Sequence, residues 1–177
     1  MERQTIHTRQ LVLRPFVVTD SSTVQRLAGD RAVADTTLAI PHPYEDGMAE
    51  EWIATHQPKF ESGELSNFAI TQQDGGQLVG AIALMINRPF DTAALGYWVG
   101  VPYWNRGYCT EAAIAVIKHG FEDLELNRIH APHLKRNPAS GRVMEKAGMT
   151  REGVARQHIK KWGLYEDLVL YGILRDD

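Results

Sequence analysis

The sequence of 177 residues has little of what several common protein classes require. Its single cysteine, Cys109, cannot form an internal disulfide, which fits a reducing compartment. The longest apolar runs, such as 78–86, are far shorter than the roughly 20 residues that span a bilayer, and the N-terminus MERQTIHTRQ has no apolar signal core. A formal net charge of −3 lacks the basic surplus of nucleic-acid-binding domains. We therefore expect a cytoplasmic protein that binds neither membranes nor nucleic acids.

The composition suits one folded domain. Hydrophobic residues make up 44% of the chain and charged residues 23%, which allows a continuous core and differs from the composition of disordered chains. The chain is too short for two domains of comfortable size. No internal repeat or low-complexity stretch is present in the sequence. We expect a single domain over residues 1–177, present as a monomer or a homodimer.

Hydrophobic periodicity predicts an α/β architecture with a mixed sheet. The clearest helix covers 110–123, where apolar residues recur at helical spacing. The turn at 74–76 joins two apolar runs into a hairpin, and Pro15 suggests that the first strand ends at a sheet edge. The expected elements are a strand at 11–16, a helix from Thr19 or Asp20 to Leu27, a helix from 44–46 to near Pro58, strands at 68–71, 78–86 and 93–99, the helix at 110–123, a strand at 128–134, a helix at 139–147 closed by Gly148, and strands at 154–159 and 166–174.

The segment between the strand ending at Val99 and the helix at 110–123 has the features of an anion site. The first N–H groups of a helix lack intrahelical acceptors, and the helix dipole places about half a positive charge there. Arg106 adds a cation, and Gly107 allows a phosphate to approach the main chain closely. The segment has neither the Gly-Lys-Ser/Thr of a Walker loop nor the further glycines of a dinucleotide fingerprint. A pyrophosphate is a fitting ligand, and the alternative is a plain connector between strand and helix.

The residues of this segment resemble the signature of a known family. The stretch Tyr103-Trp104-Asn105-Arg106-Gly107-Tyr108-Cys109-Thr110-Glu111-Ala112 resembles the acetyl-CoA signature of the GNAT acetyltransferases, in the RimJ/RimL-type branch that acetylates ribosomal-protein N-termini. Further matching segments follow in order and spacing over nearly the whole chain: LVLRPF at 11–16, PHPY at 41–44, EWI at 51–53, LNRI at 126–129, NPAS at 137–140, VMEKAGM at 143–149, REG at 151–153, WG at 162–163 and DLVLY at 167–171.

This resemblance implies a fold, an activity and a set of site residues. The fold would be that of the GNAT acyl-CoA N-acyltransferases, whose twisted, mostly antiparallel sheet is flanked by helices and splays near Val99. The activity would be transfer of the acetyl group of acetyl-CoA to a primary amine in a ternary complex, without a metal. Main-chain groups at Val99 would bind the pantetheine arm and stabilise the oxyanion. The implied cofactor-binding residues are Val99, Val101, Arg106, Gly107, Tyr108, Cys109, Thr110 and Asn137, and Ser140 would lie near the thioester sulfur.

Two positions depart from the common family pattern. Many GNAT enzymes place a tyrosine seven residues after the asparagine to protonate the leaving thiolate, but Met144 stands there and has no proton to give. Ser140 is then the best remaining acid, and the alternative is that it only caps a helix. The glutamate that the family often has before Leu95 is replaced by Ala94, so the sequence assigns no general base.

Two further residue types have competing interpretations. Cys109, near a helix start, is a candidate acyl carrier, but the favoured interpretation is a small residue packed beside the cofactor. His130 and His133 are a candidate metal pair. On a strand their spacing points the two rings to opposite faces, and no cysteine or Glu-x-x-His partner accompanies them. We therefore expect no metal.

The basicity of the amine limits the choice of acceptor. Only a neutral amine attacks, and an α-amino group has a pKa near 7.7–8.0 against about 10.4 for lysine. Because no base is assigned, we expect a protein N-terminal α-amine, as on a ribosomal protein. One alternative is a small-molecule amine, such as a polyamine or an aminoglycoside, which the net charge of −3 also suits. Another is a non-catalytic acyl-CoA sensor.

Overall fold

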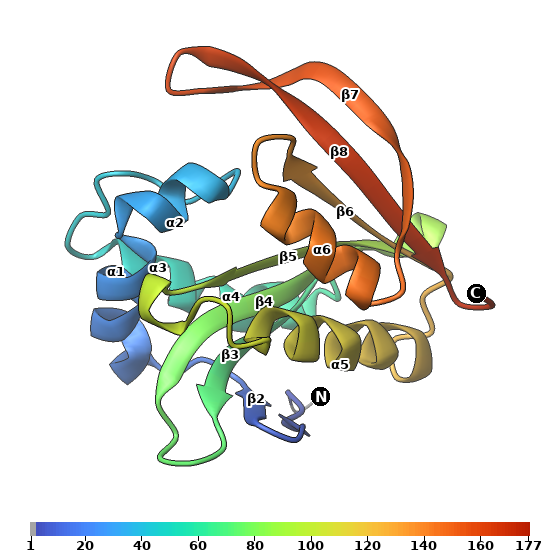
Figure 1. Ribbon diagram of the computed structural model, residues 1–177. Coiled ribbons are helices and arrows are strands. Elements are labelled where there is room, and N and C mark those ends of the chain that lie inside the picture. The colour runs from blue at the N-terminus through green and yellow to red at the C-terminus, as the bar shows by residue number, and fades with distance from the viewer. Residues whose placement is uncertain (1–2) are drawn as a thin grey trace.

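One sheet of eight strands forms the centre of the molecule, which a computed structural model describes over residues 3–177. The strand order is β1-β2-β3-β4-β5-β6-β8-β7 (Figure 1). All neighbouring strands are antiparallel except β5 and β6, which are parallel. The strands are β1 (Ile6–His7), β2 (Leu11–Arg14), β3 (Leu65–Gln72), β4 (Leu78–Asn87), β5 (Thr92–Val99), β6 (Arg128–Leu134), β7 (Thr150–Lys161) and β8 (Leu164–Leu174). This is the mixed, mostly antiparallel sheet that the sequence predicts.

Helices cover both faces of the sheet. In Figure 1, α5 lies in front of the central strands, whereas α3 and α4 lie behind them. α5 contacts β2, β4, β5 and β6, and α1 contacts β4 and β5. The helices are α1 (Ser21–Ala28), α2 (Arg31–Thr36), α3 (Met48–Ala54), α4 (His56–Glu61), α5 (Tyr108–Glu122) and α6 (Pro138–Lys146). None of the helices within residues 3–177 has the length and hydrophobicity of a membrane-crossing segment.

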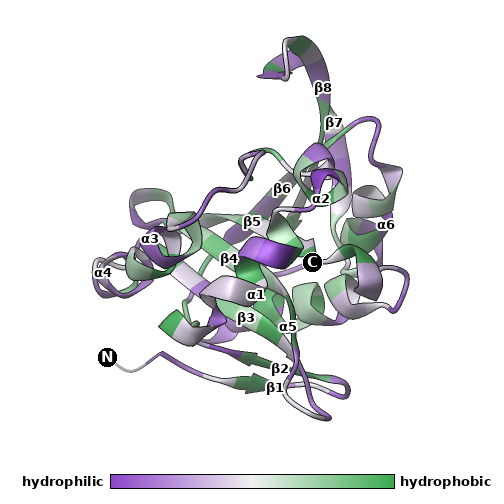
Figure 2. Ribbon diagram, turned by 90° about the vertical axis from the view of Figure 1, so that its left-hand side faces the viewer, coloured by the Kyte–Doolittle hydropathy of each residue, from purple (hydrophilic) through white to green (hydrophobic). Residues whose placement is uncertain are grey.

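The hydrophobic core lies between these helices and the central strands. Figure 2 shows hydrophobic residues gathered on β3, β4 and α5, while the projecting hairpin of β7 and β8 carries mostly hydrophilic ones. The first half of β4 is buried on both faces, which explains its continuous apolar run. Leu84 and Ile129 from neighbouring halves of the sheet are both fully buried. Each such side chain contributes roughly 1.5–3 kcal/mol to stability.

A polar chain that runs from buried Ser66 through buried His119 to exposed Asp123 fixes α5 against β3. His119 Nε2 lies 3.1 Å from Ser66 Oγ, and His119 Nδ1 lies 2.7 Å from Asp123 Oδ2. Phe68 packs edge-on against the same imidazole ring. The three polar residues have the order of a hydrolase triad, but Ser66 is only 4% exposed. A substrate has no access to its hydroxyl, and we interpret the chain as structural.

The two halves of the sheet separate after a short parallel ladder. This ladder joins Thr92–Ala94 to Arg128–His130, whereas β5 continues to Val99 and β6 continues to Leu134. β5 stays paired with β4 and β6 stays paired with β8, so each half follows its own twist. The splay predicted near Val99 is thereby confirmed, and it begins already beyond Ala94.

Most elements lie where the periodicity predicts them. β6 matches the expected 128–134, and α5 begins two residues earlier than expected, at Tyr108. The helix expected from 44–46 begins only at Met48, because Gly47 before it has a φ of 87°, outside the helical region. Pro58 lies in the first turn of α4, where a missing N–H removes no helical hydrogen bond.

Two short elements escape the sequence analysis. β1 pairs with Val12 and Leu13 on the outer side of β2, so β2 is not the outermost strand, and Pro15 follows its last residue. α2 has six residues, too few for a periodic pattern. Its start is marked by Asp30, whose side chain accepts a hydrogen bond from the Ala32 N–H at 2.8 Å. Asp30 therefore begins a helix that the sequence analysis does not predict.

Gly80 allows β4 and β5 to approach each other beside the splay. A Cβ at this position would collide with the Trp98 carbonyl oxygen and lie 3.0 Å from Val99 Cα, and neither backbone atom can move aside alone. We expect Gly80→Ala to lower the free energy of unfolding by about 1–3 kcal/mol in urea denaturation. The control is Gly153→Ala on β7, where a new Cβ meets no atom within 4 Å and no loss is expected. Equal stability of the two variants would contradict this account.

Candidate active site

A cleft of 370 Å³ opens where β5 and β6 separate. Its walls come from α2, the end of β5, the loop before α5, the first turn of α5 and the first turns of α6. Segments far apart in the sequence therefore meet at the splay. The lining residues are Val33, Thr36, Thr37, Tyr97–Val99, Tyr103–Thr110, Asn137, Ala139, Ser140, Arg142, Val143 and Lys146.

The cleft gathers nearly all of the site residues predicted from the sequence. Val99, Asn137, Ser140 and the whole segment from Arg106 to Thr110 line it. Val101 does not, because it lies in the short 3₁₀ turn that leads away from β5. Met144, at the position of the usual family tyrosine, is 2% exposed and belongs to the hydrophobic core.

The backbone of β5 presents hydrogen-bonding groups to the cleft. The Gly100 N–H donates to the Val79 carbonyl at 2.9 Å, so these two residues form a hydrogen-bonded pair across β4 and β5. Such pairs alternate along an antiparallel ladder, and the N–H and C=O groups of Tyr97 and Val99 therefore point away from β4, toward the gap. The Val99 carbonyl accepts the indole N–H of Trp104 at 2.7 Å. One of the groups expected to bind a ligand is thus engaged within the chain.

The first turn of α5 has the features expected of an anion site beside the end of β5. Gly107 is the N-cap residue with a φ of 80°, and a Cβ there would meet no atom within 4 Å. The space beside this turn is therefore open, and glycine is the residue that adopts this conformation without strain. No side chain caps the helix, so its first N–H groups are available to a phosphate. Arg106 is exposed, with its guanidinium 5.7 Å from the centre of the Tyr103 ring.

Two basic residues on α6 face the same cleft and were missed by the sequence analysis. Arg142 and Lys146 both line it, on the side of α6 that also carries Val143. Their spacing of four residues places them on one helical face. The sequence does contain a signal for them: two basic residues four positions apart in the helix expected after Asn137. Together with Arg106 they make this part of the cleft positive.

The thiol of Cys109 lies in a nonpolar environment. Burial raises its pKa to about 12, so the thiol stays protonated at neutral pH. A thiolate is the nucleophilic form of cysteine, and this environment therefore opposes a role as covalent acyl carrier. It favours the interpretation of Cys109 as a small residue that packs beside the ligand.

Ser140 and Tyr97 face each other across the splay. The two hydroxyl oxygens are 2.8 Å apart, and the Tyr97 hydroxyl also donates to the Ser140 carbonyl at 3.1 Å. Ser140 lies inside the first turn of α6, whose N-cap residue is Asn137. The geometry therefore does not favour a capping role for Ser140. Tyr97 was missed by the sequence analysis, although it lies two residues before Val99 and hence on the same face of β5.

The side chain of Asn137 reaches α2. Its Nδ2 donates to the Thr36 carbonyl at 3.3 Å. Both residues line the cleft. A contact between Asn137 and the acyl-CoA arm remains a prediction, and the amide nitrogen already has a partner within the chain.

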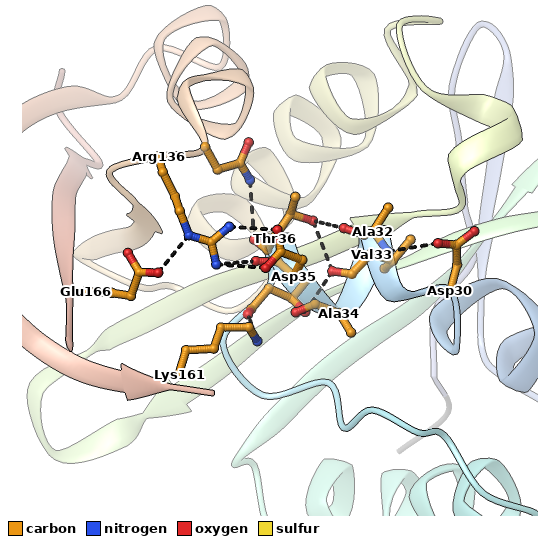
Figure 3. Close-up of polar contacts among 11 residues, drawn as sticks. Asp30, Ala32, Val33, Ala34, Asp35, Thr36, Arg136, Lys161 and Glu166 are labelled. Atoms are coloured by element: carbon orange, nitrogen blue, oxygen red, sulfur yellow. Dashed lines mark hydrogen bonds and ion pairs between the residues drawn. The ribbon is translucent and has the colours of Figure 1, made fainter. Parts of the chain in front are cut away.

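Ion pairs hold α2 to the opposite wall of the cleft (Figure 3). Arg136 donates to both carboxylate oxygens of Asp35 at 2.8 and 3.0 Å, and to Glu166 at 2.7 Å. Lys161 Nζ donates to the Thr37 carbonyl at 2.6 Å. The carboxylates of Asp35 and Glu166 raise the pKa of Arg136. We call these five residues the α2 clasp.

The two histidines considered as a metal pair lie on β6. His133 is 7% exposed, and its Nδ1 lies 2.8 Å from the Leu134 carbonyl. His130 is half-buried, and burial lowers its pKa. Over residues 3–177, no group of three or more His, Cys, Asp or Glu side chains is placed to hold a metal ion.

The lining of the cleft includes no group of the usual general-base type. Among its lining residues, all within the described part of the chain, none is aspartate, glutamate or histidine. Asp35 and Glu166 of the α2 clasp are ion-paired with Arg136. Ala94, at the position where the family often has glutamate, pairs with His130 at the end of the parallel ladder.

Comparisons with known proteins bear on the family. Residues 10–150 match the family model described as "Acetyltransferase (GNAT) domain". YnaD, an uncharacterized N-acetyltransferase of Bacillus subtilis (strain 168), is 31% identical over 172 residues, which are 97% of this chain and 98% of that protein. The ribosomal protein uS5-alanine N-acetyltransferase of Escherichia coli (strain K12) is 25% identical over 117 residues, 65% of this chain and 60% of that protein.

A solved structure agrees with this result. The crystal structure of a GNAT-family acetyltransferase from Bacillus anthracis has a TM-score of 0.86 and 29% identity, covering 98% of this chain and 100% of that one. The family model spans most of the chain, and YnaD matches it almost from end to end. The chain therefore belongs to the GNAT acetyltransferase family and is an acetyl-CoA-dependent N-acetyltransferase.

Proposed function

We propose that the acceptor is the α-amino group of a protein N-terminus. The observation that carries this proposal is the lining of the cleft, which within residues 3–177 includes no carboxylate and no imidazole. An ammonium group has to lose its proton before its nitrogen attacks a thioester. In a cleft without a base for this proton, an acceptor that is already partly neutral in solution reacts fastest.

The fraction of neutral amine differs greatly between a protein N-terminus and a lysine side chain. At pH 7.5 an α-amino group is about one-third neutral, whereas a lysine side chain is neutral in about one molecule per thousand. The difference is roughly 250-fold, which is comparable to the 10²- to 10⁴-fold gain that a positioned general base gives. A cleft without such a base is therefore suited to an N-terminus and poorly suited to lysine.

Two further observations support this acceptor class. The E. coli relative is named for acetylation of the alanine of ribosomal protein uS5. A polyamine carries several positive charges and is best held by free carboxylates. Asp35 and Glu166, the carboxylates of the α2 clasp, are instead bound to Arg136.

The residues of the cleft fit acetyl-CoA, which supplies the activated acetyl group when it is bound. The open N–H groups at the start of α5, together with Arg106, would hold the pyrophosphate. Tyr108, Cys109 and Thr110 provide the main chain of that turn. Arg142 and Lys146 add positive charge along α6. Main-chain groups at the end of β5 would hold the pantetheine arm.

We assign Ser140 the role of hydrogen-bond donor to the departing thiolate. Model thiols have a pKa near 8.5, so this leaving group needs only modest assistance. A hydroxyl group can give it as a hydrogen bond to the negative charge, which is worth roughly 1.5–3 kcal/mol. Ser140 lines the cleft, and its hydroxyl is directed toward Tyr97 rather than toward a helix N–H.

The acceptor proposal predicts both a substrate preference and a pH dependence. In a thiol-release assay, peptides with a free N-terminus should react at least about 100-fold faster than N-terminally blocked lysine peptides or spermidine at pH 7.5. Below the pKa of the α-amine, kcat/KM should rise about tenfold per pH unit, because the neutral fraction grows as the pH rises. The value of kcat/KM should reach a plateau near pH 8, where most of the α-amine is neutral. A plateau set instead by a pKa unrelated to the acceptor would reveal a base on the enzyme and overturn the argument.

A second prediction concerns the turn at Gly107. Gly107→Val places a side chain in the space beside the first N–H groups of α5, so it should weaken binding of CoA at least about tenfold in calorimetry. The matched control is Gly75→Val in the turn between β3 and β4, where glycine has nearly the same φ, 79° against 80°. The control should lose stability to a similar degree and keep its affinity for CoA. Equal affinities for CoA would mean that the turn at Gly107 is only a connector.

A third prediction concerns Ser140. Removal of the hydroxyl in Ser140→Ala should lower kcat by at least about tenfold, while the Kd for acetyl-CoA stays within about threefold. This is the pattern of an interaction made chiefly in the transition state. Single-turnover kinetics and calorimetry separate the two quantities. An unchanged kcat would rule out this role for Ser140.

A further inference from the structure

Tyr97 is the residue of the cleft whose hydroxyl touches Ser140. Its ring projects from β5 at the splay, and the hydroxyl reaches the first turn of α6. Two acceptors on the same residue lie within reach: Ser140 Oγ at 2.8 Å and the Ser140 carbonyl at 3.1 Å. Both residues line the cleft. The pair therefore joins the two walls at the point where the strands have separated.

The two hydroxyl protons can be arranged in two ways. In the first, the Tyr97 proton points to the Ser140 carbonyl and the Ser140 proton points to the Tyr97 oxygen. In the second, the Tyr97 proton points to Ser140 Oγ, and the Ser140 proton is free to point into the cleft. Only the second arrangement lets Ser140 donate to a negative charge. Tyr97 donates one hydrogen bond in either case; the one that it accepts from Ser140 in the first arrangement is replaced, in the second, by the one that Ser140 gives to the negative charge.

The surroundings of Tyr97 favour a phenol that donates a hydrogen bond and disfavour one that gives up its proton. Burial raises the pKa of its phenol well above the usual value, and the hydrogen bond with Ser140 only partly offsets this effect. The phenol therefore keeps its proton at any pH at which the enzyme works. A buried phenolate would be costly, so Tyr97 is not a source of protons for the thiolate.

We propose that Tyr97 is a positioning residue for Ser140: its O–H donates to Ser140 Oγ and thereby directs the serine proton into the cleft. The proposal rests on the role assigned to Ser140 in the proposed function. No bond to Tyr97 forms or breaks, and no proton leaves it. When the oxygen of a hydroxyl group accepts a hydrogen bond, its O–H becomes a better donor, because hydrogen bonds in a chain polarise one another.

The test compares two phenol-to-phenyl substitutions. Tyr97→Phe removes the hydroxyl that touches Ser140, and Tyr171→Phe removes the hydroxyl of another tyrosine, whose partner is Glu145 at 2.9 Å, outside the cleft. Tyr97→Phe should lower kcat roughly three- to tenfold, the value of one hydrogen bond, with the Kd for acetyl-CoA unchanged within about threefold. Tyr171→Phe should leave kcat unchanged. Equal effects of the two variants on kcat would overturn the proposal.

A double-mutant cycle tests whether Tyr97 acts through Ser140. In the Ser140→Ala background, Tyr97→Phe should have no further effect on kcat, because the group that it positions is gone. Full additivity of the two losses would show that Tyr97 acts independently and would contradict the proposal. Thermal melting of each variant checks that all of them are folded.

A binding measurement provides a readout that needs no acceptor. The thiol of bound CoA can be titrated by the ultraviolet absorbance of its thiolate. In the unaltered enzyme and in Tyr171→Phe its pKa should lie below that of free CoA titrated in the same buffer, because a donor faces the sulfur. In Tyr97→Phe it should rise toward the free value. Identical titrations in all three would overturn the proposal, and the result stands even if N-terminal peptides prove not to be acceptors.

Discussion

The separation of β5 from β6 beyond Ala94 is the constraint on which the site depends. A continuous ladder would pair the main-chain groups of Tyr97 and Val99 with β6 and leave them no access to a ligand. Because the strands part, these groups, the start of α5 and the first turn of α6 face one space. The same gap lets the Tyr97 hydroxyl reach Ser140 from the opposite wall. The cleft is thus produced by sheet geometry rather than by any single loop.

The sequence predicts the parts of this arrangement that depend on local pattern. The helix from Tyr108, the hairpin of β3 and β4, and β6 each follow from periodicity and turn residues. The turn at Arg106 and Gly107 has the local features of an anion site, but an Arg-Gly turn is common by itself and resemblance decides in favour of a phosphate; the role expected of Ser140 follows from resemblance alone. The splay also follows from resemblance. No pattern within β5 or β6 indicates that their pairing stops after three residues on each strand.

The features that the sequence does not reveal depend on contacts between distant segments. Tyr97 reads as an ordinary strand residue until α6, about forty residues later, places Ser140 against its hydroxyl. The α2 clasp likewise joins Asp35 to Arg136 and Glu166, which lie far along the chain. α2 itself is too short to give a periodic signal. Such pairs become visible only once the fold brings the segments together.

The two departures from the family pattern, Met144 and Ala94, have a common consequence. Together they remove the usual acid and the usual base, so the site has neither a strong proton donor for the thiolate nor a strong acceptor for the amine. The reaction needs no net proton from the protein, because the amine loses one proton when it becomes an amide and the thiolate gains one. An ammonium acceptor has to lose one further proton to solvent before it attacks, and this earlier step costs an α-amine, with a pKa of about 7.7–8.0, much less than it costs lysine. On the proposed function, hydrogen bonds from Tyr97 to Ser140 and from Ser140 to the sulfur are sufficient assistance for an α-amine, and lysine, more basic by over two pKa units, is the poorer acceptor.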